Sequence, residues 1–226
     1  MARALSDPAR TAGVGMTSAR TRARMVARLR SKGIRDERVL AAMAAVPRHL
    51  FVDSALESRA YEDSALPIGF SQTISQPFVV ARMIELVLQE RTPGKTLEVG
   101  TGCGYQAALL ATICPEVYSI ERIKALHERS RANLRALRLA NLRLAHGDGY
   151  GGLEPAAPFH SIIVAAAAPR VPQALARQLA PDGRMILPLA QPAGGQRLVR
   201  LERRGRSYQE TELDPVHFVP LEAGKS

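Results

Sequence analysis

Two segments of this sequence carry residue types that could do chemistry. Residues 97–106 form an apolar run that ends in closely spaced glycines and leads into a helical pattern, a shape that binds a nucleotide-like ligand through its backbone. Residues 66–77 form a hydroxyl-rich turn that ends at Pro77, and proline is favoured at the first position of a helix. Thr73 and Ser75 lie at that helix start, where a carboxylate is favourably held. A cofactor site preceded by an anion site indicates an enzyme at which two ligands meet.

The glycines of the second segment have the spacing GxGxG, not the GxGxxG of dinucleotide enzymes. A glycine loop alone is also typical of a tight turn from strand to helix, so the acids around it decide. Glu121 closes the next predicted strand, where an acid can bind both ribose hydroxyls, and Asp148 follows the third, where an acid can reach an adenine amino group. This order resembles that of S-adenosylmethionine methyltransferases. The predicted cofactor-binding residues are Glu98, Gly100, Thr101, Gly102, Gly104, Glu121, Asp148 and Gly149.

The elements that must position these residues follow from hydrophobic periodicity. Helical patterns in the N-terminal part end at Gly33 and Pro47, and a third helix follows Pro77. Further along, short apolar runs alternate with helical segments, which predicts right-handed βαβ units and a mostly parallel sheet. The predicted strands are 96–99, 117–120, 142–145, 161–165 and 184–189, and the predicted helices between them are 105–113, 123–138 and 172–180. Runs at 196–203 and 208–213 predict a C-terminal antiparallel hairpin.

These elements predict an α/β fold of the class I S-adenosylmethionine methyltransferase type. It would combine a Rossmann-like, mostly parallel sheet and a C-terminal antiparallel hairpin with an N-terminal helical extension. We expect a single methyltransferase domain over 17–226, with a helical and substrate-binding part at 17–92 and a cofactor-binding sheet at 93–226. Residues 1–16 are rich in Ala and Arg and are expected to be a disordered leader. A transit-type leader, or a start at Met16, is the alternative.

Composition excludes several function classes. The formal net charge of +10 lies mostly in predicted helices and in the N-terminal tail, and aromatic residues make up only 4%, so nucleic-acid binding is not expected. No apolar stretch approaches the roughly 20 residues that span a bilayer. Cys103 and Cys114 are separated by a mostly helical segment that exceeds disulfide reach, and the scattered histidines have no ligand partner nearby. We therefore expect no disulfide, no metal, no membrane segment and a cytoplasmic location.

Ten short motifs give residues 24–221 a specific resemblance to the protein-L-isoaspartate O-methyltransferase family. The motifs lie at 46–48, 51–53, 66–69, 72–77, 80–83, 97–102, 104–106, 119–122, 147–149 and 218–221. The Thr73-Ile74-Ser75 turn is peculiar to that family among methyltransferases. The chain departs from the family at Phe70, a bulky residue before the turn, and at His160 and Ala165, which replace an acid and a hydroxyl at the fourth predicted strand. These departures leave the catalytic turn intact and bear on substrate or cofactor binding.

The resemblance implies methyl transfer from S-adenosylmethionine to the free carboxylate of L-isoaspartyl and D-aspartyl residues in damaged proteins or peptides. The methyl ester would then collapse to a succinimide, and S-adenosylhomocysteine would be released. Ser75 is implied as the catalytic residue that orients the carboxylate, with Thr73 and Ile74 beside it as substrate-binding residues. Val219, Pro220 and Leu221 are implied to line a substrate groove, where an extended segment could pair with a peptide backbone. The enzyme is expected to be a monomer.

Two other functions stay open at this point. One is methylation of an aspartate in a different peptide, such as a natural-product precursor, which a lack of activity on unrelated isoaspartyl peptides would reveal. The other is a non-catalytic or nucleic-acid-binding module that keeps the fold for its shape, which a cofactor titration would test.

Overall fold

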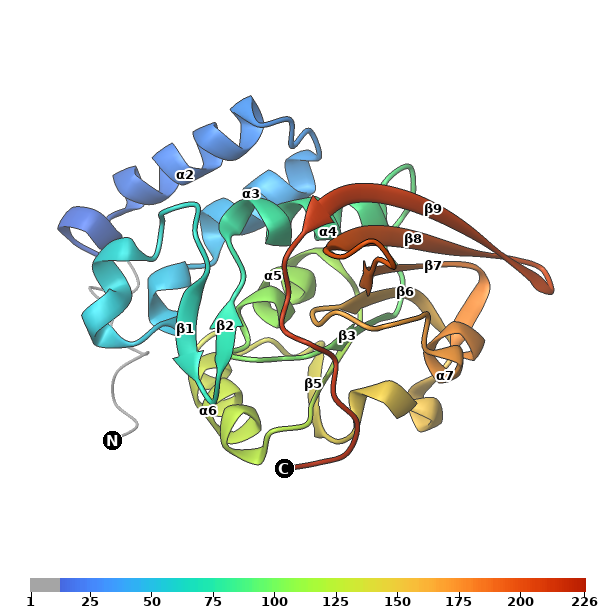
Figure 1. Ribbon diagram of the computed structural model, residues 1–226. Coiled ribbons are helices and arrows are strands. Elements are labelled where there is room, and N and C mark those ends of the chain that lie inside the picture. Colours follow the sequence, from blue (N-terminus) through green and yellow to red (C-terminus); the bar gives the residue numbers. More distant parts are fainter. Residues whose placement is uncertain (1–12) are drawn as a thin grey trace.

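A seven-stranded sheet forms the centre of the molecule in the computed structural model, which describes residues 13–226 (Figure 1). The strand order is β5-β4-β3-β6-β7-β8-β9. The first five of these strands run parallel and the last two antiparallel, which confirms the predicted fold class. The strands are β3 (Thr96–Val99), β4 (Val117–Glu121), β5 (Leu142–His146), β6 (Phe159–Val164), β7 (Leu179–Ala190), β8 (Gln196–Arg204) and β9 (Ser207–Val216).

The chain runs outward in one direction from β3 and in the other from β6, although these two strands are neighbours. Their junction is the topological switch point of the sheet. Open α/β sheets bind their ligands at the carboxyl edge of such a point. The strand order therefore places the glycine loop after β3 where a ligand would bind.

Helices pack on both faces of the sheet. Alternate residues of β6 show this, since Ile163 belongs to one buried apolar cluster and Ile162 to the other. The first cluster includes side chains of α2 (Ala19–Ser31), α3 (Glu37–Ala45), α4 (Pro77–Leu88), α5 (Tyr105–Ile113) and α6 (Lys124–Arg135). The second includes side chains of α7 (Gln173–Arg177). The predicted helix 172–180 is longer than α7 because β7 already begins at Leu179.

Local sequence signals set the helix starts in the N-terminal part. The Ser18 hydroxyl accepts a hydrogen bond from the amide of Thr21 at the start of α2, and the Asp36 carboxylate accepts one from Arg38 at the start of α3. The short 3₁₀ segments η2 (Arg48–Phe51) and η3 (Ser54–Arg59) lead on to the functional turn.

The predicted leader lies mostly outside the described residues, and its end is part of the fold. Gly15–Thr17 form a 3₁₀ turn, η1, which contacts η3. The Thr21 hydroxyl donates to the main-chain oxygen of Gly15 over 3.1 Å. The folded chain therefore begins before the predicted boundary at residue 17.

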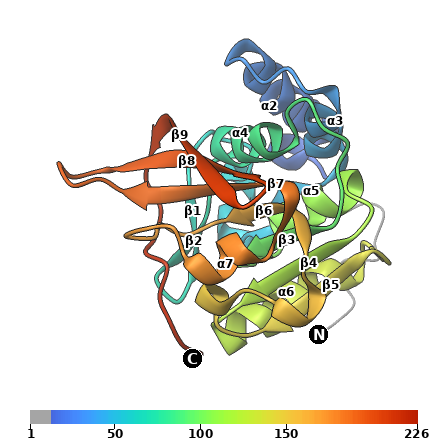
Figure 2. The same cartoon turned by 90° about the vertical axis from the view of Figure 1, so that its right-hand side faces the viewer.

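A small hairpin, β1 (Leu66–Gly69) with β2 (Gln72–Ile74), occupies the segment that the sequence analysis treated only as a turn. Phe70 and Ser71 form its two-residue loop with φ of 54° and 56°. The Arg129 guanidinium of α6 donates to the main-chain oxygen of Ile68 over 2.8 Å and so ties the hairpin to the main domain. Figure 2 shows that the longer hairpin of β8 and β9 extends away from the sheet.

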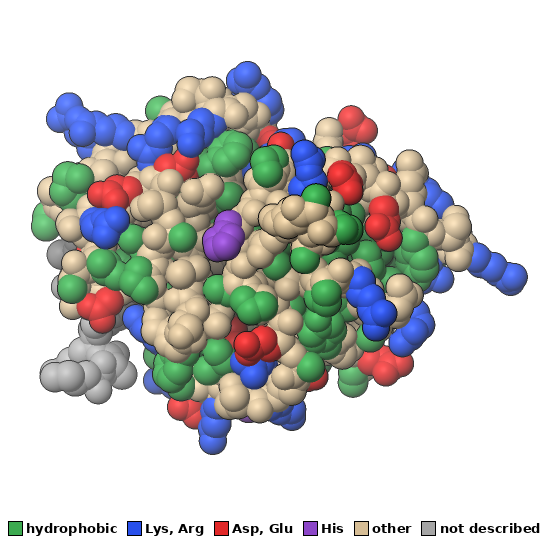
Figure 3. Space-filling model, in the orientation of Figure 1, with side chains coloured by type: hydrophobic (Ala, Val, Ile, Leu, Met, Phe, Trp, Pro, Cys, Tyr) green, Lys and Arg blue, Asp and Glu red, His purple; other side chains and the backbone are tan. Residues whose placement is uncertain are grey.

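Basic side chains gather on the outer side of α2, which is visible in the space-filling view (Figure 3). Arg30 of that helix pairs with Glu37, and Lys32 just after it pairs with Asp63. Part of the excess positive charge thus lies on a predicted helix, as expected. Across residues 13–226, no helix has the length and apolar character needed to cross a membrane.

Candidate active site

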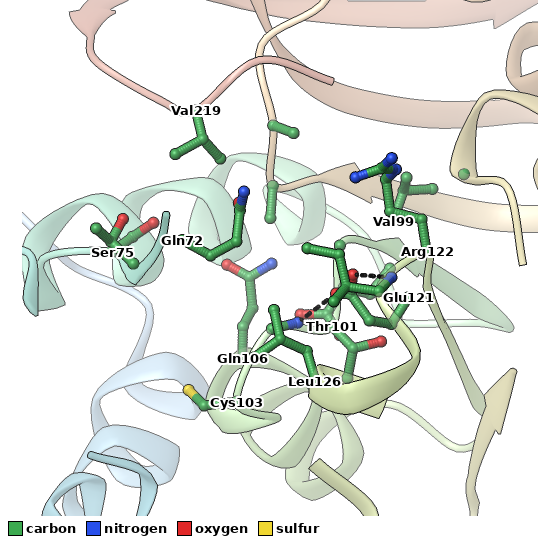
Figure 4. Close-up of a pocket in the computed structure, with 18 of the residues that line it drawn as sticks. Gln72, Ser75, Val99, Thr101, Cys103, Gln106, Glu121, Arg122, Leu126 and Val219 are labelled. Carbon is green, nitrogen blue, oxygen red and sulfur yellow. Dashed lines mark hydrogen bonds between the residues drawn. The ribbon is translucent and has the colours of Figure 1, made fainter. Parts of the chain in front are cut away.

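A single open cavity at the carboxyl edge of β3, β4 and β6 brings both predicted ligand sites together. Its volume is about 860 Å³, open mouth included. The wall includes most of the predicted site residues: Thr73, Ile74, Ser75, Glu98, Gly100, Thr101, Gly102, Glu121, Gly149, Val219, Pro220 and Leu221. Gly104 and Asp148 are absent from that wall. Figure 4 shows Ser75 and Glu121 on opposite sides of the cavity, with Gln106 between them.

The glycine loop is held by the Glu121 carboxylate. Its Oε2 accepts a hydrogen bond from the Gly102 amide over 2.8 Å, and its Oε1 accepts one from the Ile123 amide over 3.0 Å (Figure 4). Gly104 has a φ of 93°, and a Cβ there would lie 2.9 Å from Leu134 of α6. Gly104 therefore serves the turn and its packing against α6, whereas Glu121 retains lone pairs that can bind hydroxyls of a ligand.

Glu98 is a fully buried carboxyl group in the cavity wall. The Ser119 hydroxyl donates to its Oε2 and also lies 2.6 Å from the Thr101 hydroxyl. Burial raises the pKa of Glu98 to about 8, because the hydrogen bond from Ser119 and the nearby Gln106 amide offset only part of the desolvation, and the charge of Glu121 raises it further. At neutral pH this carboxyl group is mostly protonated.

Gln106 was given no role in the sequence analysis, yet it completes a polar pair with Glu98. Within the described part of the chain, Gln106 Nε2 and Glu98 Oε1 are buried without a hydrogen bond of good geometry, although the Gln106 amide lies close enough to Glu98 to lower its pKa. Buried polar atoms of this kind are rare unless a ligand or water satisfies them. Once Glu98 is ionised, its Oε1 is an acceptor and Gln106 Nε2 is a donor, so together they suit a group that carries both an acceptor and a donor. The only sequence signal was the position of Gln106 two residues after the last glycine.

Ser75 lies between β2 and α4 with its hydroxyl available. The N-cap of α4 is Gln76, so Ser75 is not the capping residue of this helix. None of the hydrogen bonds found among residues 13–226 engages the Ser75 side chain, and the side chain is half-buried in the cavity wall. This hydroxyl can therefore donate to a ligand in the cavity.

The amides of the α4 start are less available than the sequence suggested. Pro77 has no N–H, and the Phe78 amide donates to the Asp63 carboxylate over 2.9 Å. Asp63 also pairs with Lys32 over 2.5 Å. A negative charge thus already lies at the positive end of the helix, and a substrate carboxylate depends mainly on side-chain donors such as Ser75.

The C-terminal residues of the predicted groove form one wall of the cavity. The Ala167 amide donates to the main-chain oxygen of Val219, and the Leu221 amide donates to that of Ala167, each over 2.8 Å. These bonds hold one edge of the extended segment and leave the opposite edge at Pro220 free of strand pairing within the described residues.

The Asp148 carboxylate is not part of the cavity wall. Its Oδ1 accepts a hydrogen bond from the Tyr150 amide over 2.9 Å, and its Oδ2 accepts one from the Gly224 amide over 2.8 Å. Gly149 does line the cavity. Each Asp148 oxygen keeps a further lone pair, so an adenine contact by Asp148 stays a prediction.

The histidines, the cysteines and a metal site play no part in the chemistry of this cavity. No histidine is found among the described residues that line the cavity, so no imidazole base faces a ligand there. Cys103 and Cys114 are free and buried, and burial raises the pKa of the Cys103 thiol. Of the three departures from the family, only Ala165 lies in the cavity wall. Within residues 13–226, no group of three or more His, Cys, Asp or Glu side chains could hold a metal ion.

Comparisons with known proteins point to one family. The sequence profile of the family "Protein-L-isoaspartate(D-aspartate) O-methyltransferase (PCMT)" matches residues 20–226. The protein-L-isoaspartate O-methyltransferase of Dechloromonas aromatica is 62% identical over 213 residues, which cover 94% of this chain and 98% of that protein. The enzyme of the same name from Azoarcus sp. is 60% identical over 206 residues, with 91% and 94% covered.

The comparison with solved structures is consistent with this family. A protein-L-isoaspartate O-methyltransferase structure superposes with a TM-score of 0.81 at 26% identity and covers 89% of this chain and 66% of its own. A Plasmodium falciparum protein, described as a beta-aspartate methyltransferase and solved in complex with S-adenosyl-L-homocysteine, has a TM-score of 0.78 at 24% identity, with 88% and 97% covered. The second likeness supports the fold.

Proposed function

This chain belongs to the protein-L-isoaspartate(D-aspartate) O-methyltransferase family, and from that premise we infer that it methylates the free carboxylate of L-isoaspartyl and D-aspartyl residues in damaged proteins and peptides. S-adenosylmethionine is the methyl donor, and S-adenosylhomocysteine is the product. The observation that carries the inference is the shared cavity, because Ser75 of the family turn and Glu121 of the glycine loop line the same space.

Methyl transfer to a carboxylate requires little acid or base catalysis from the protein. A carboxyl group in water titrates near 4, so the substrate oxygen is already ionised at neutral pH and needs no general base. The cavity wall accordingly offers no histidine among its described residues. What the protein must supply is alignment of the attacking oxygen with the methyl group and exclusion of water.

Ser75 supplies the alignment in this proposal. Its hydroxyl donates a hydrogen bond to one oxygen of the substrate carboxylate and leaves the other oxygen free to attack. Thr73 and Ile74 precede it on β2 and border the same part of the cavity. The peptide backbone lies along residues 219–221, where the main-chain oxygen of Pro220, on the edge opposite Ala167, can accept a hydrogen bond from it.

The residues of the glycine-loop side fit S-adenosylmethionine. The unpartnered acceptor Glu98 Oε1 and the unpartnered donor Gln106 Nε2 complement the ammonium and carboxylate of its amino-acid end. Glu121, already fixed by two amides, has lone pairs left for the ribose hydroxyls. When bound, the cofactor supplies an electrophilic methyl group on sulfur.

The proposal extends to the location, the oligomeric state and the metal requirement of the enzyme. We propose that the enzyme acts in the cytoplasm, which two free cysteines favour. We also propose that it works as a monomer, and that it needs no metal because the chemistry requires no Lewis acid.

The decisive experiment compares a synthetic isoaspartyl peptide with its normal aspartyl twin. Methyl transfer from labelled S-adenosylmethionine to the first peptide and not to the second supports the proposal, and several unrelated isoaspartyl sequences should be accepted. Ser75→Ala serves as the catalytic control. Equal methylation of both twins, or activity confined to a single peptide sequence, would contradict a repair function.

A further inference from the structure

Arginine side chains from two parts of the chain meet in the interior beside the end of η3. Arg48 of η2 is fully buried, and Arg22 of α2 is only 9% exposed. Burial raises the pKa of Tyr61, and the charges of Arg22 and Arg48 both act against this rise. Burial also raises the pKa of Tyr105, against the charges of the same two arginines. Because a charge acts on a pKa in this way only from nearby, both guanidinium groups lie close to the same two hydroxyls.

We call Arg22, Arg28 and Arg48 the buried arginine cluster, and it has more hydrogen-bond donors than partners. Arg48 Nε donates to the main-chain oxygen of Ala60 over 2.9 Å, and Arg28 Nη2 donates to that of Tyr61 over 2.5 Å. Four other nitrogens are buried without a hydrogen-bond partner in the described part of the chain: Arg22 Nη1, Arg28 Nε, Arg48 Nη1 and Arg48 Nη2. A guanidinium group has donors only, so each of these nitrogens requires an acceptor.

The surrounding side chains do not supply these acceptors. The Tyr61 hydroxyl lies 2.8 Å from His49 Nδ1, and the Tyr105 hydroxyl donates to Met43 Sδ over 3.6 Å. None of the ion pairs found among residues 13–226 includes an arginine of the cluster. The acceptor for the four nitrogens must therefore come from outside this set of side chains.

The charge of the cluster is unbalanced as well. Burial lowers the pKa of Arg48, and Asp63 is the one carboxylate among the groups that oppose this shift. Asp63 makes its hydrogen bonds to Lys32 and to the Phe78 amide, so its negative charge is shared with another cation. Buried charges are normally paired, because an uncompensated charge in the interior is costly. A water molecule could accept hydrogen bonds from the arginines but would not balance their charge.

We propose that the buried arginine cluster binds a small inorganic anion of the halide class, such as chloride. A halide ion accepts several hydrogen bonds from any direction, which suits nitrogens that come from three side chains. A single negative charge also costs less to dehydrate than the charge of a phosphate or sulfate ion. The Arg48 guanidinium lies 5.0 Å from the ring centre of Tyr105, which lines the cavity, whereas Arg48 itself does not. The ion would therefore lie behind the cavity wall, and the proposal does not depend on methyl transfer.

Anomalous diffraction from crystals of the full-length protein in sodium bromide tests the site directly. Bromide replaces chloride chemically, and its anomalous signal distinguishes it from water. We expect a peak within hydrogen-bond distance of Arg22 Nη1 and of both Nη atoms of Arg48, and no such peak in Arg48→Met. An ordered water alone, an oxyanion, or no density at this place would overturn the proposal.

Thermal unfolding tests binding in solution, and α2 offers a matched control. Arg24 follows Arg22 by two positions and is exposed, so Arg24→Met and Arg22→Met remove the same charge. Chloride is titrated in place of gluconate, an anion too large for the site, at constant ionic strength. The melting temperature of the unmodified protein and of Arg24→Met should rise by about 3–6 °C when chloride reaches about ten times its dissociation constant.

The variants of the cluster should lack this rise. Arg22→Met and Arg48→Met should melt at a temperature that does not depend on the choice of anion. If Arg48→Met does not fold, Arg22→Met decides, since it removes one of the four donors and a charge from the edge of the site. An equal rise in all proteins would reveal a general salt effect, and no rise in the unmodified protein would show that no halide binds. Either result contradicts the proposal.

Discussion

We expect the enzyme to release a proton when it binds S-adenosylhomocysteine, and replacing Glu98 with glutamine should abolish this release. The pKa of Glu98 is raised from 4.5 to about 8, so its carboxyl group is about nine-tenths protonated near pH 7. An ammonium group placed at Oε1 favours the ionised form. Binding near pH 7 should therefore release close to one proton from Glu98, and about half a proton near pH 8.

The same shift has a defined sign for stability. The folded protein holds this proton more tightly than the unfolded chain, so the free energy of unfolding falls as pH rises from about 4.5 towards about 8. At 1.36 kcal/mol for each unit of pKa, the loss totals roughly 5 kcal/mol across that window. Glu98→Gln removes this loss and should unfold at a higher temperature than the unmodified protein near pH 8, with little difference near pH 4.5.

Calorimetry in buffers of different ionisation enthalpy measures the released protons. The amino group of the ligand also titrates near 8, but it does so equally with both proteins, and the difference between them isolates Glu98. Affinity of the unmodified protein should rise up to about tenfold relative to Glu98→Gln between about pH 7 and pH 8.5. Equal proton release by the two proteins would refute a protonated Glu98.

Three other predictions concern the catalytic turn, the ribose acid and the start of the chain. Ser75→Ala should lower turnover by about 10²–10³ and leave the S-adenosylhomocysteine affinity unchanged. The methyl-transfer rate of the unmodified enzyme should stay nearly flat between about pH 6 and 8, because no base is titrated. A steep rise of this rate near pH 7 would indicate a histidine base. Glu121→Ala should weaken cofactor binding by about 1–3 kcal/mol in calorimetry, since the ribose hydroxyls lose their acceptor and the glycine loop loses the bonds from the Gly102 and Ile123 amides that hold it in place. A chain that begins at Met16 should keep its activity but melt slightly earlier, because the Thr21 hydroxyl loses its main-chain acceptor.

The parts of the site that could be predicted are those with a local signal. The glycine spacing required a tight turn after β3, and Glu121 was identified by its place at the end of β4, so the cofactor edge of the sheet followed from pattern alone. Pro77 fixed the start of α4 in the same way. Such signals act over a few residues, within which chain geometry leaves few choices.

The missed features depend on contacts between distant residues. Asp63 occupies the α4 amide from 15 positions away, and Asp148 meets Gly224 across 76 positions. Gln106 looked like any helical glutamine, because only the packed cavity reveals that its amide is buried without a partner. An acid or amide in a motif thus indicates that a polar group is needed there, whereas its partner is decided by tertiary packing.

The loop of the β1–β2 hairpin leads to a final prediction. Hairpins with two-residue loops prefer Asn-Gly because both loop residues need positive φ, whereas this chain has Phe70 and Ser71 at 54° and 56°. The left-handed conformation costs about 1–2 kcal/mol for a residue with a Cβ, and glycine avoids this cost. Because glycine also has more conformational freedom in the unfolded chain, roughly half of the resulting gain in stability is lost again. Ser71→Gly should therefore raise the free energy of unfolding by about 0.5–1 kcal/mol in denaturant titrations, and Phe70→Gly should do the same because its side chain is 57% exposed and loses little packing. Ser71→Ala keeps the Cβ and should give no gain. A loss of stability in both glycine variants would show that the ring and the hydroxyl hold the hairpin over the cavity by contacts that outweigh the strain.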